Sequence, residues 1–206
     1  ILPSFWGSTG IMLVVGAVLY TVFLLFSGAT LMQGALCLWL FLEMVVNWNA
    51  MSYLTAIKDY KSILYSFAAA VLVAFITSCV LLALALPPVE SLLFAVVLGY
   101  GVMLVWDVLL LHRYFPQSRE NPWLFLQWVD QFLPLALTGL FTTIGLFAHL
   151  VITWCGPLGI KVKGLFYGAP YYDVPAMLAF LTILITTVNF VVSVEVNFYP
   201  TYRSYY

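Results

Sequence analysis

The sequence predicts an all-α, polytopic transmembrane helix bundle of about six spans. Hydrophobic residues make up 65% of the chain and charged residues only 7%, whereas a soluble domain carries roughly a quarter charged residues. Apolar runs longer than the roughly 18 residues that mark a membrane span recur along the whole chain. These runs lack the alternating pattern of a barrel, and lipid requires each backbone polar group to be satisfied internally, so the runs must be helices.

The first element in chain order is an apolar run that starts after an N-terminal segment with neither the basic start nor the cleavage site of a secretory signal. Because the chain begins with Ile1, we expect it to start inside a longer protein. The six predicted spans are Gly10 to Phe26, Leu31 to Ala56, Ile63 to Leu86, Leu92 to Leu111, Phe132 to Trp154 and Val174 to Val196. Turn residues separate several of them, as is typical of tight turns at a membrane surface: Ser27-Gly28, Pro87-Pro88 and Gly156-Pro157.

The polar stretch from His112 to Gln131 is the longest water-compatible segment between two spans. It is therefore the best candidate for a boundary between lobes. We divide the chain there, with residues 1–115 as helices of a first lobe and residues 116–206 as an inter-lobe linker followed by the first two helices of a second.

Basic residues set the expected orientation, because Lys and Arg in short loops favour the cytoplasmic side. One side of the predicted bundle carries most of them: Lys58, Lys61, Arg113, Arg119 and Arg203. The other side carries only Lys161 and Lys163. Both ends of this chain are therefore expected to be cytoplasmic, with the loop from Cys155 to Tyr172 outside.

Polar residues on the second span form one stripe on an otherwise apolar helix. Gln33, Cys37, Glu43 and Asn47 recur at three-to-four-residue offsets or their multiples, so the stripe should face protein or a cavity. Two interpretations of Glu43 stay open. It lines a cavity, which we prefer, or it is protonated and hydrogen-bonded to a neighbouring helix.

Other polar side chains lie on later spans. His149 near the outer end of the fifth span is either a proton relay or a satisfied interfacial histidine. Asn189 lies on one polar face of the last span, and Glu195 lies on another face, near the inner end of that span. Asp107 and Asp130 are expected to mark the interface, where a carboxylate can be hydrated.

Enzymatic function is not expected, because the sequence lacks a phosphate-binding Gly-rich loop, an HExxH pair and a Gly-x-Ser-x-Gly elbow. We predict no catalytic residue, no cofactor and no metal site, since the three cysteines have no metal-ligand spacing. The net charge of −1 and the absence of a basic tract argue against nucleic acid as a partner.

Three stretches, in this order along the chain, resemble motifs of the PelG family. Ser52 to Ile63 is similar to a loop of the family in which an alanine or glycine and a lysine precede a tyrosine and a basic residue. Asp173 to Thr182 is similar to the pattern D-(V/T)-(P/A)-x-x-L-A-(F/Y)-L-T, and Val194 to Tyr206 to the pattern (V/T)-E-x-(D/N)-F-x-x-x-Y-R-x-(F/Y)-(Y/F). The resemblance covers nearly the whole chain.

The resemblance implies an inner-membrane exporter of Pel-type exopolysaccharide for the biofilm matrix, with a fold like that of the MOP flippases. By that comparison this chain is the central part of such a protein. The implied partners are the polysaccharide, a cytoplasmic glycosyltransferase, a cyclic-di-GMP-binding membrane receptor of the same synthase complex, and the lipid bilayer. The candidates for lining or gating the polymer route are Glu43, Asn47, Asn189 and Glu195.

Two alternatives remain at this stage. The protein is a flippase for a lipid-linked saccharide, working by rocking between lobes, or a non-transporting scaffold that holds a polysaccharide synthase at the membrane. Polar stripes on several helices favour transport over scaffolding. Only the resemblance favours polymer export over flipping.

Overall fold

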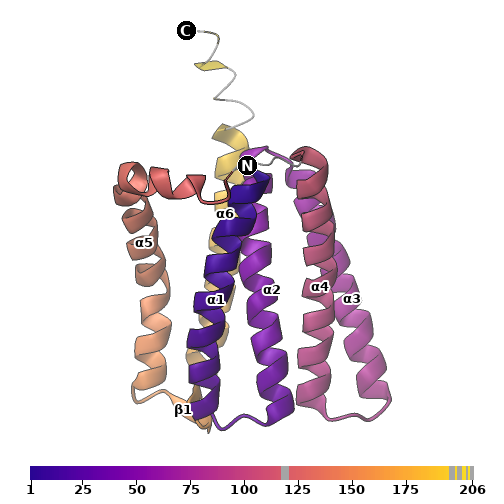
Figure 1. Ribbon diagram of the computed structural model, residues 1–206. Helices are drawn as coiled ribbons and strands as arrows, with labels where there is room; N and C mark the ends of the chain where they lie inside the picture. The colour runs from indigo at the N-terminus through magenta and orange to yellow at the C-terminus, as the bar shows by residue number, and fades with distance from the viewer. Residues whose placement is uncertain (117–120, 195–197, 199–200, 203, 205–206) are drawn as a thin grey trace. The chain divides into compact units, whose positions relative to one another are not determined.

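The computed structural model (Figure 1) describes residues 1–116, 121–194, 198, 201–202 and 204. It contains two compact units, Ile1–Thr138 and Gly139–Tyr206, whose boundary falls within the fifth helix. The division at residues 1–115 and 116–206, which concerns lobes of a larger protein, stays a prediction.

The helical fold class is confirmed. Five described helices are long and apolar enough to cross a membrane. The helices are α1 (Leu2–Phe26), α2 (Leu31–Ala56), α3 (Tyr60–Ala83), α4 (Pro88–Tyr114), the short 3-10 helix η1 (Leu124–Trp128), α5 (Val129–Cys155) and α6 (Pro170–Ser193). The strands are β1 (Ile160–Lys163) and β2 (Phe166–Gly168).

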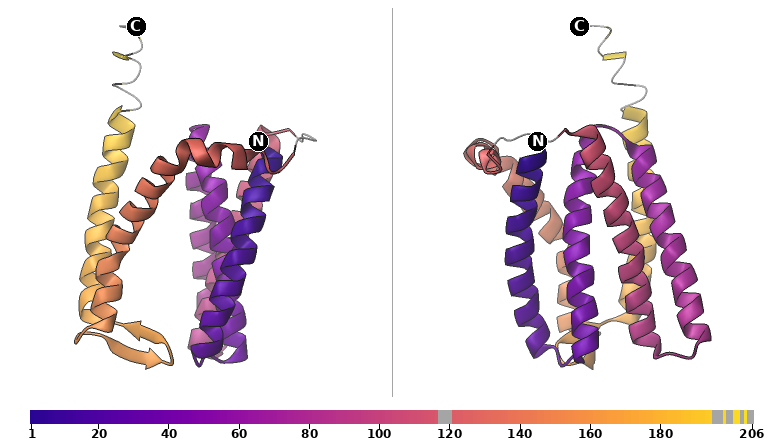
Figure 2. Two further views of the ribbon diagram at one scale, coloured as in Figure 1. Left: turned by 60° about the vertical axis from the view of Figure 1, so that its left-hand side comes forward. Right: turned by 45° about the vertical axis from the view of Figure 1, so that its right-hand side comes forward.

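In the first unit, α4 lies between α2 and α3, and α1 packs on the other side of α2. The right-hand view of Figure 2 shows the resulting order α1, α2, α4, α3. Chain order and spatial order therefore differ, because α4 inserts between the two helices that precede it. Because α2 lies between α1 and α4, its polar side chains can be covered by a neighbouring helix instead of facing lipid.

The α3–α4 contact depends on small residues. Buried positions of α4 recur at four-residue steps: Ser91, Ala95, Gly99, Met103, Asp107 and Leu111. A Cβ atom added at Gly99 would lie 2.6 Å from the Ala70 carbonyl oxygen and 2.9 Å from the Ala74 Cβ atom. Because the hydrophobic effect does not drive helices together in lipid, such close approach of backbones is what stabilises the contact.

Local signals explain where the helices begin. Thr30 and Gln33 form a capping box at the start of α2, after Gly28 has turned the chain with φ of 67°. Asp59 accepts a hydrogen bond from the Ser62 amide at the start of α3. At the start of α4, Pro88 occupies the first helical turn, where its missing N–H would have no partner anyway.

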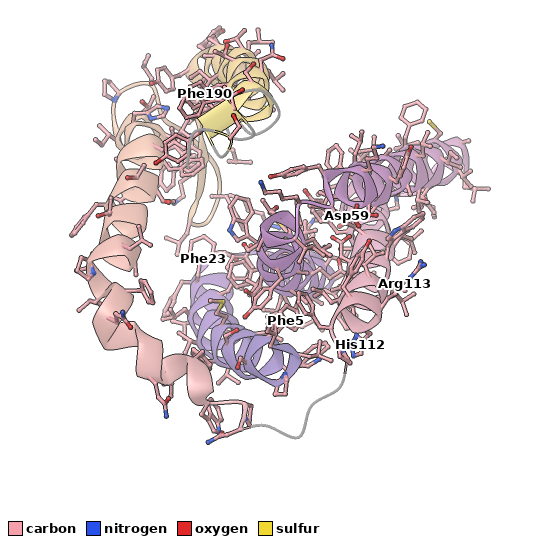
Figure 3. All side chains as sticks on the ribbon, turned by 90° about the horizontal axis from the view of Figure 1, so that it is seen from above. Phe5, Phe23, Asp59, His112, Arg113 and Phe190 are labelled. Atoms are coloured by element: carbon pink, nitrogen blue, oxygen red, sulfur yellow. The ribbon has the colours of Figure 1, made fainter. Side chains whose placement is uncertain are left out.

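One end of the first unit is held by aromatic and polar contacts, and Figure 3 looks down on it. Phe5, only 1% exposed, packs edge-on against Tyr53, with ring centroids 5.4 Å apart. The Tyr114 hydroxyl donates to the Asp59 carboxylate at 2.6 Å. Hydrogen bonds from Ser62 and Tyr114 lower the pKa of Asp59.

The second unit contains a β-hairpin in the segment expected to be an outer loop. β1 and β2 pair antiparallel, with Ile160 opposite Gly168, and Gly164 turns the chain with φ of 53°. Asp173, in the first turn of α6, closes the hairpin base. Its Oδ1 accepts from the Trp154 indole N–H at 2.9 Å and its Oδ2 from the Ala169 amide at 2.8 Å. One carboxylate therefore joins α5, the hairpin and α6.

Candidate functional site

Glu43 lies at the contact between α2 and α4 and is 9% exposed. Its Oε1 accepts a hydrogen bond from the Trp39 indole N–H at 2.8 Å. It lies against Gly101 of α4, where an added Cβ atom would be 3.1 Å from Oε1. Its Oε2 has no hydrogen-bond partner among the described residues. The absence of a side chain at Gly101 makes room for the carboxyl group.

Asn47 lies one turn further along α2, on the same face, and is 2% exposed. Its Nδ2 donates to the Tyr100 carbonyl oxygen at 3.1 Å, and its Oδ1 has no described partner. Gln33, at the other end of the polar stripe, donates to Glu90 of α4 at 2.8 Å. The structure thus places three residues of the polar stripe, Gln33, Glu43 and Asn47, against α4.

Two apolar grooves flank Glu43. The α2–α4 groove, about 810 Å³, is lined by Trp39 and Glu43 of α2 and by Val105, Trp106 and Arg113 of α4, among others. A second groove, about 580 Å³, adds α1 residues and shares Trp39 and Glu43 with the first. Apolar and aromatic walls with a few polar groups are typical of small-molecule sites.

The chemistry available in the α2–α4 groove is that of an acceptor beside aromatic rings. Trp39 is 60% exposed and Trp106 is 42% exposed, so both indoles have free surface. The Glu43 oxygen that lacks a donor, Oε2, is itself buried, so a ligand reaches it only when α2 and α4 move apart. The exposed indoles can cover an apolar face of a ligand in the groove, and the carboxyl group can accept a hydrogen bond from that ligand once Oε2 is exposed.

Asp107 is not a hydrated interfacial residue, so that expectation was wrong. It is fully buried where α4 meets α3, and both of its carboxyl oxygens lack a hydrogen-bond partner among the described residues. The four-residue spacing from Gly99 through Met103 to Asp107 placed it on the buried face of α4. That spacing could have revealed it, because residues four apart share one helix face.

His149 lies between α5 and α6 in the second unit. Its ring is 5.8 Å from those of Tyr172 and Phe180, centroid to centroid. The three side chains border a groove of about 480 Å³. The histidine is therefore part of an aromatic contact between the two helices, and its use as a proton relay stays a prediction.

The remaining candidates for the polymer route belong to the second unit or lie outside the described residues. Asn189 is exposed on α6, in the second unit. Glu195 lies outside the described residues, as do Arg119 and Arg203. Within the described part of the chain, no group of three or more His, Cys, Asp or Glu side chains could hold a metal ion.

The apolar helices, with buried polar groups between them, define a multi-pass membrane protein. The chain belongs to the PelG family, whose model, described as "Putative exopolysaccharide Exporter (EPS-E)", matches residues 1–206. No match was found among curated proteins or among solved structures. The family's description makes the protein an exopolysaccharide exporter in class.

Proposed function

We propose that this protein exports a Pel-type polysaccharide, an amino-sugar polymer of the biofilm matrix, across the bacterial inner membrane. The observation that carries the proposal is the family match over the whole chain. The α2–α4 groove supports it, since exposed indoles beside the acceptor Glu43 suit a ligand with hydroxyl groups and apolar ring faces.

Glu43 and Asn47 are the first candidates for the polymer route. A hydrated polymer crosses hydrocarbon only where polar and aromatic groups replace its water. Glu43 provides a carboxyl group, which suits a partly cationic amino-sugar chain, and Asn47 provides a buried amide oxygen without a donor, which the polymer would reach only when α2 and α4 move apart. Asn189, Glu195 and His149 are assigned to the same route, as gating residues and, for His149, as a proton relay.

The proposed orientation puts both ends of this chain in the cytoplasm. In the first unit, Lys58, Lys61 and Arg113 all lie at the end that carries the Asp59–Tyr114 hydrogen bond. Basic residues at one end of a helix bundle favour the cytoplasmic side. This end is the proposed docking surface for a cytoplasmic glycosyltransferase and a cyclic-di-GMP-binding membrane receptor.

The test is secretion of polysaccharide by the native bacterium when the full-length protein carries Trp106→Ala or Glu43→Ala. Trp48→Ala is the matched control, because Trp48 is an exposed indole of α2, 77% exposed, that does not line the α2–α4 groove. We expect both groove variants to lower secreted polymer while protein level, synthase activity and complex assembly match the wild type, and Trp48→Ala to secrete normally.

Three other outcomes would overturn parts of this proposal. Unchanged secretion in both groove variants removes the groove from the route. Loss of the assembled complex in Glu43→Ala and Trp106→Ala indicates a scaffold. Accumulation of a lipid-linked saccharide on the cytoplasmic leaflet indicates a flippase.

A further inference from the structure

Asp107 is a buried acidic residue that has no part in the proposed polymer route. It lies on the face of α4 that contacts α3 and has no exposed surface. The described side chain that interacts with it is Ser66 of α3, which is also fully buried. The Ser66 hydroxyl donates its proton to the Ile63 carbonyl oxygen at 3.0 Å. Ser66 therefore has no hydrogen left for Asp107, and both carboxyl oxygens lack a donor.

An ionised Asp107 does not fit this environment. A buried carboxylate without a cation or hydrogen-bond donors costs several kcal/mol, and membrane depth adds to that cost. A neutral carboxylic acid has an O–H donor, and a serine hydroxyl oxygen can accept a hydrogen bond while its own hydrogen is donated elsewhere. A proton on Asp107 would let the acid donate to the Ser66 hydroxyl oxygen, which already donates its own hydrogen to the Ile63 carbonyl oxygen.

No neighbouring charge replaces that proton. The structure gives Asp107 no interaction with the titratable side chains of the elements packed around it. Those side chains are Tyr60, Lys61, Tyr65 and Cys79 on α3, Cys37, Glu43 and Tyr53 on α2, and Glu90, Tyr100, His112, Arg113 and Tyr114 on α4 itself.

We propose that Asp107 is a proton-binding site of the membrane interior, and that the α3–α4 contact in this structure is its protonated state. When the proton leaves, the carboxylate must reach water, so α3 and α4 separate at the level of Ser66. Gly99, two turns from Asp107 along α4, and Ala70, one turn from Ser66 along α3, keep the helices in contact. The opening is thus confined to the end that carries Tyr114, about 10 Å along α4 from Asp107.

This inference does not depend on polysaccharide export, so its test uses no substrate. Full-length protein in lipid nanodiscs is titrated with acid and base while the infrared C=O band of neutral carboxylic acids is recorded. Hydrogen–deuterium exchange of α3 and α4 is followed in parallel. We expect part of the band to disappear as pH rises, together with faster exchange at the Ser66 level of α3.

Three variants identify the group. Asp107→Asn should remove that part of the band and make the exchange of α3 independent of pH, whereas the matched change Glu43→Gln should leave both intact. Ser66→Ala should keep the acid but move its band to higher wavenumber, because the O–H group loses its acceptor. Retention of the whole pH-dependent band in Asp107→Asn would overturn the proposal.

Two further results would also overturn it. One is an unshifted band in Ser66→Ala, which means that Ser66 is not the acceptor. The other is a band of constant size at every pH with unchanged exchange, which means that the acid never releases its proton. If Asp107→Asn does not fold, the Ser66→Ala band and the wild-type titration still decide the question.

Discussion

Replacing Asp173 with alanine should open the hairpin of the second unit. The carboxylate accepts two hydrogen bonds, from the Trp154 indole at 2.9 Å and from the Ala169 amide at 2.8 Å. Ala169 is 1% exposed, so its N–H group is left without an acceptor when the carboxylate is removed. Asp173 also lies in the first turn of α6, where a negative charge is favourable.

The size of the effect follows from these contacts. Each hydrogen bond to a charged group contributes about 1.5–3 kcal/mol, and Asp173→Ala removes two of them. Water replaces part of this contribution at a half-buried site, so we expect a loss of about 2–4 kcal/mol in local stability. At 1.4 kcal/mol for each factor of ten, hydrogen exchange of the Ala169 amide should become roughly 30-fold to 700-fold faster. Asp173→Asn should give an intermediate exchange rate. The asparagine side chain has a single acceptor oxygen, which can keep one of the two hydrogen bonds, and its NH₂ group then faces the other donor.

The assay is hydrogen–deuterium exchange with mass spectrometry on the full-length protein in nanodiscs, read at the segment from Gly168 to Tyr172. Asp59→Asn is the matched control, because it removes a carboxylate from the first unit and should leave this segment unchanged. Wild-type protection at Ala169 in Asp173→Ala would refute the role assigned to the carboxylate.

Three further changes test the first unit. Gly99→Ala should lower its stability by about 1–3 kcal/mol, because the added methyl group meets the α3 backbone; thermal unfolding should show a loss that Gly139→Ala, with nothing within 4 Å, does not. Thr30→Ala should cost about 1 kcal/mol at the start of α2 and Thr30→Ser almost nothing, again by thermal unfolding. The pKa of Asp59 is lowered in the folded state, so its stabilising effect is complete above the usual pKa of about 4 and is lost as pH falls further. Asp59→Asn should remove that acid sensitivity when unfolding is measured in an acid titration, and Tyr114→Phe should reduce the sensitivity in part. An identical pH profile in Asp59→Asn and wild type would contradict this role of Asp59.

The sequence predicted helices well where apolar runs coincide with helix signals. The span from Leu31 to Ala56 has the bounds of α2, since Thr30 caps its first turn. The start of the first span was predicted at Gly10, whereas α1 begins at Leu2. Pro3 and the polar residues that follow it are typical of a loop, but proline is also tolerated in the first turn of a helix.

Features that depend on contacts far apart in the sequence were not predicted. Two strands of four and three residues are too short for a periodic signal. The four-residue spacing puts Asp107 on the same face of α4 as Gly99 and Met103, but no local pattern shows that α4 inserts between α2 and α3 and so buries that face. For Glu43 and Asn47, the helical spacing predicted one shared face correctly, but it could not identify α4 as the helix they contact.

The most direct test of the proposed function is movement of the polymer itself. Inverted inner-membrane vesicles that contain the full-length protein are given amino-sugar polymer made by the glycosyltransferase on their outer, cytoplasmic face, and a glycoside hydrolase is then added outside. We expect polymer to enter the vesicles and become protected from the hydrolase, whereas vesicles without the protein should leave it fully digestible. Complete digestion in both kinds of vesicle, with the synthase complex assembled and active, would contradict export by this protein.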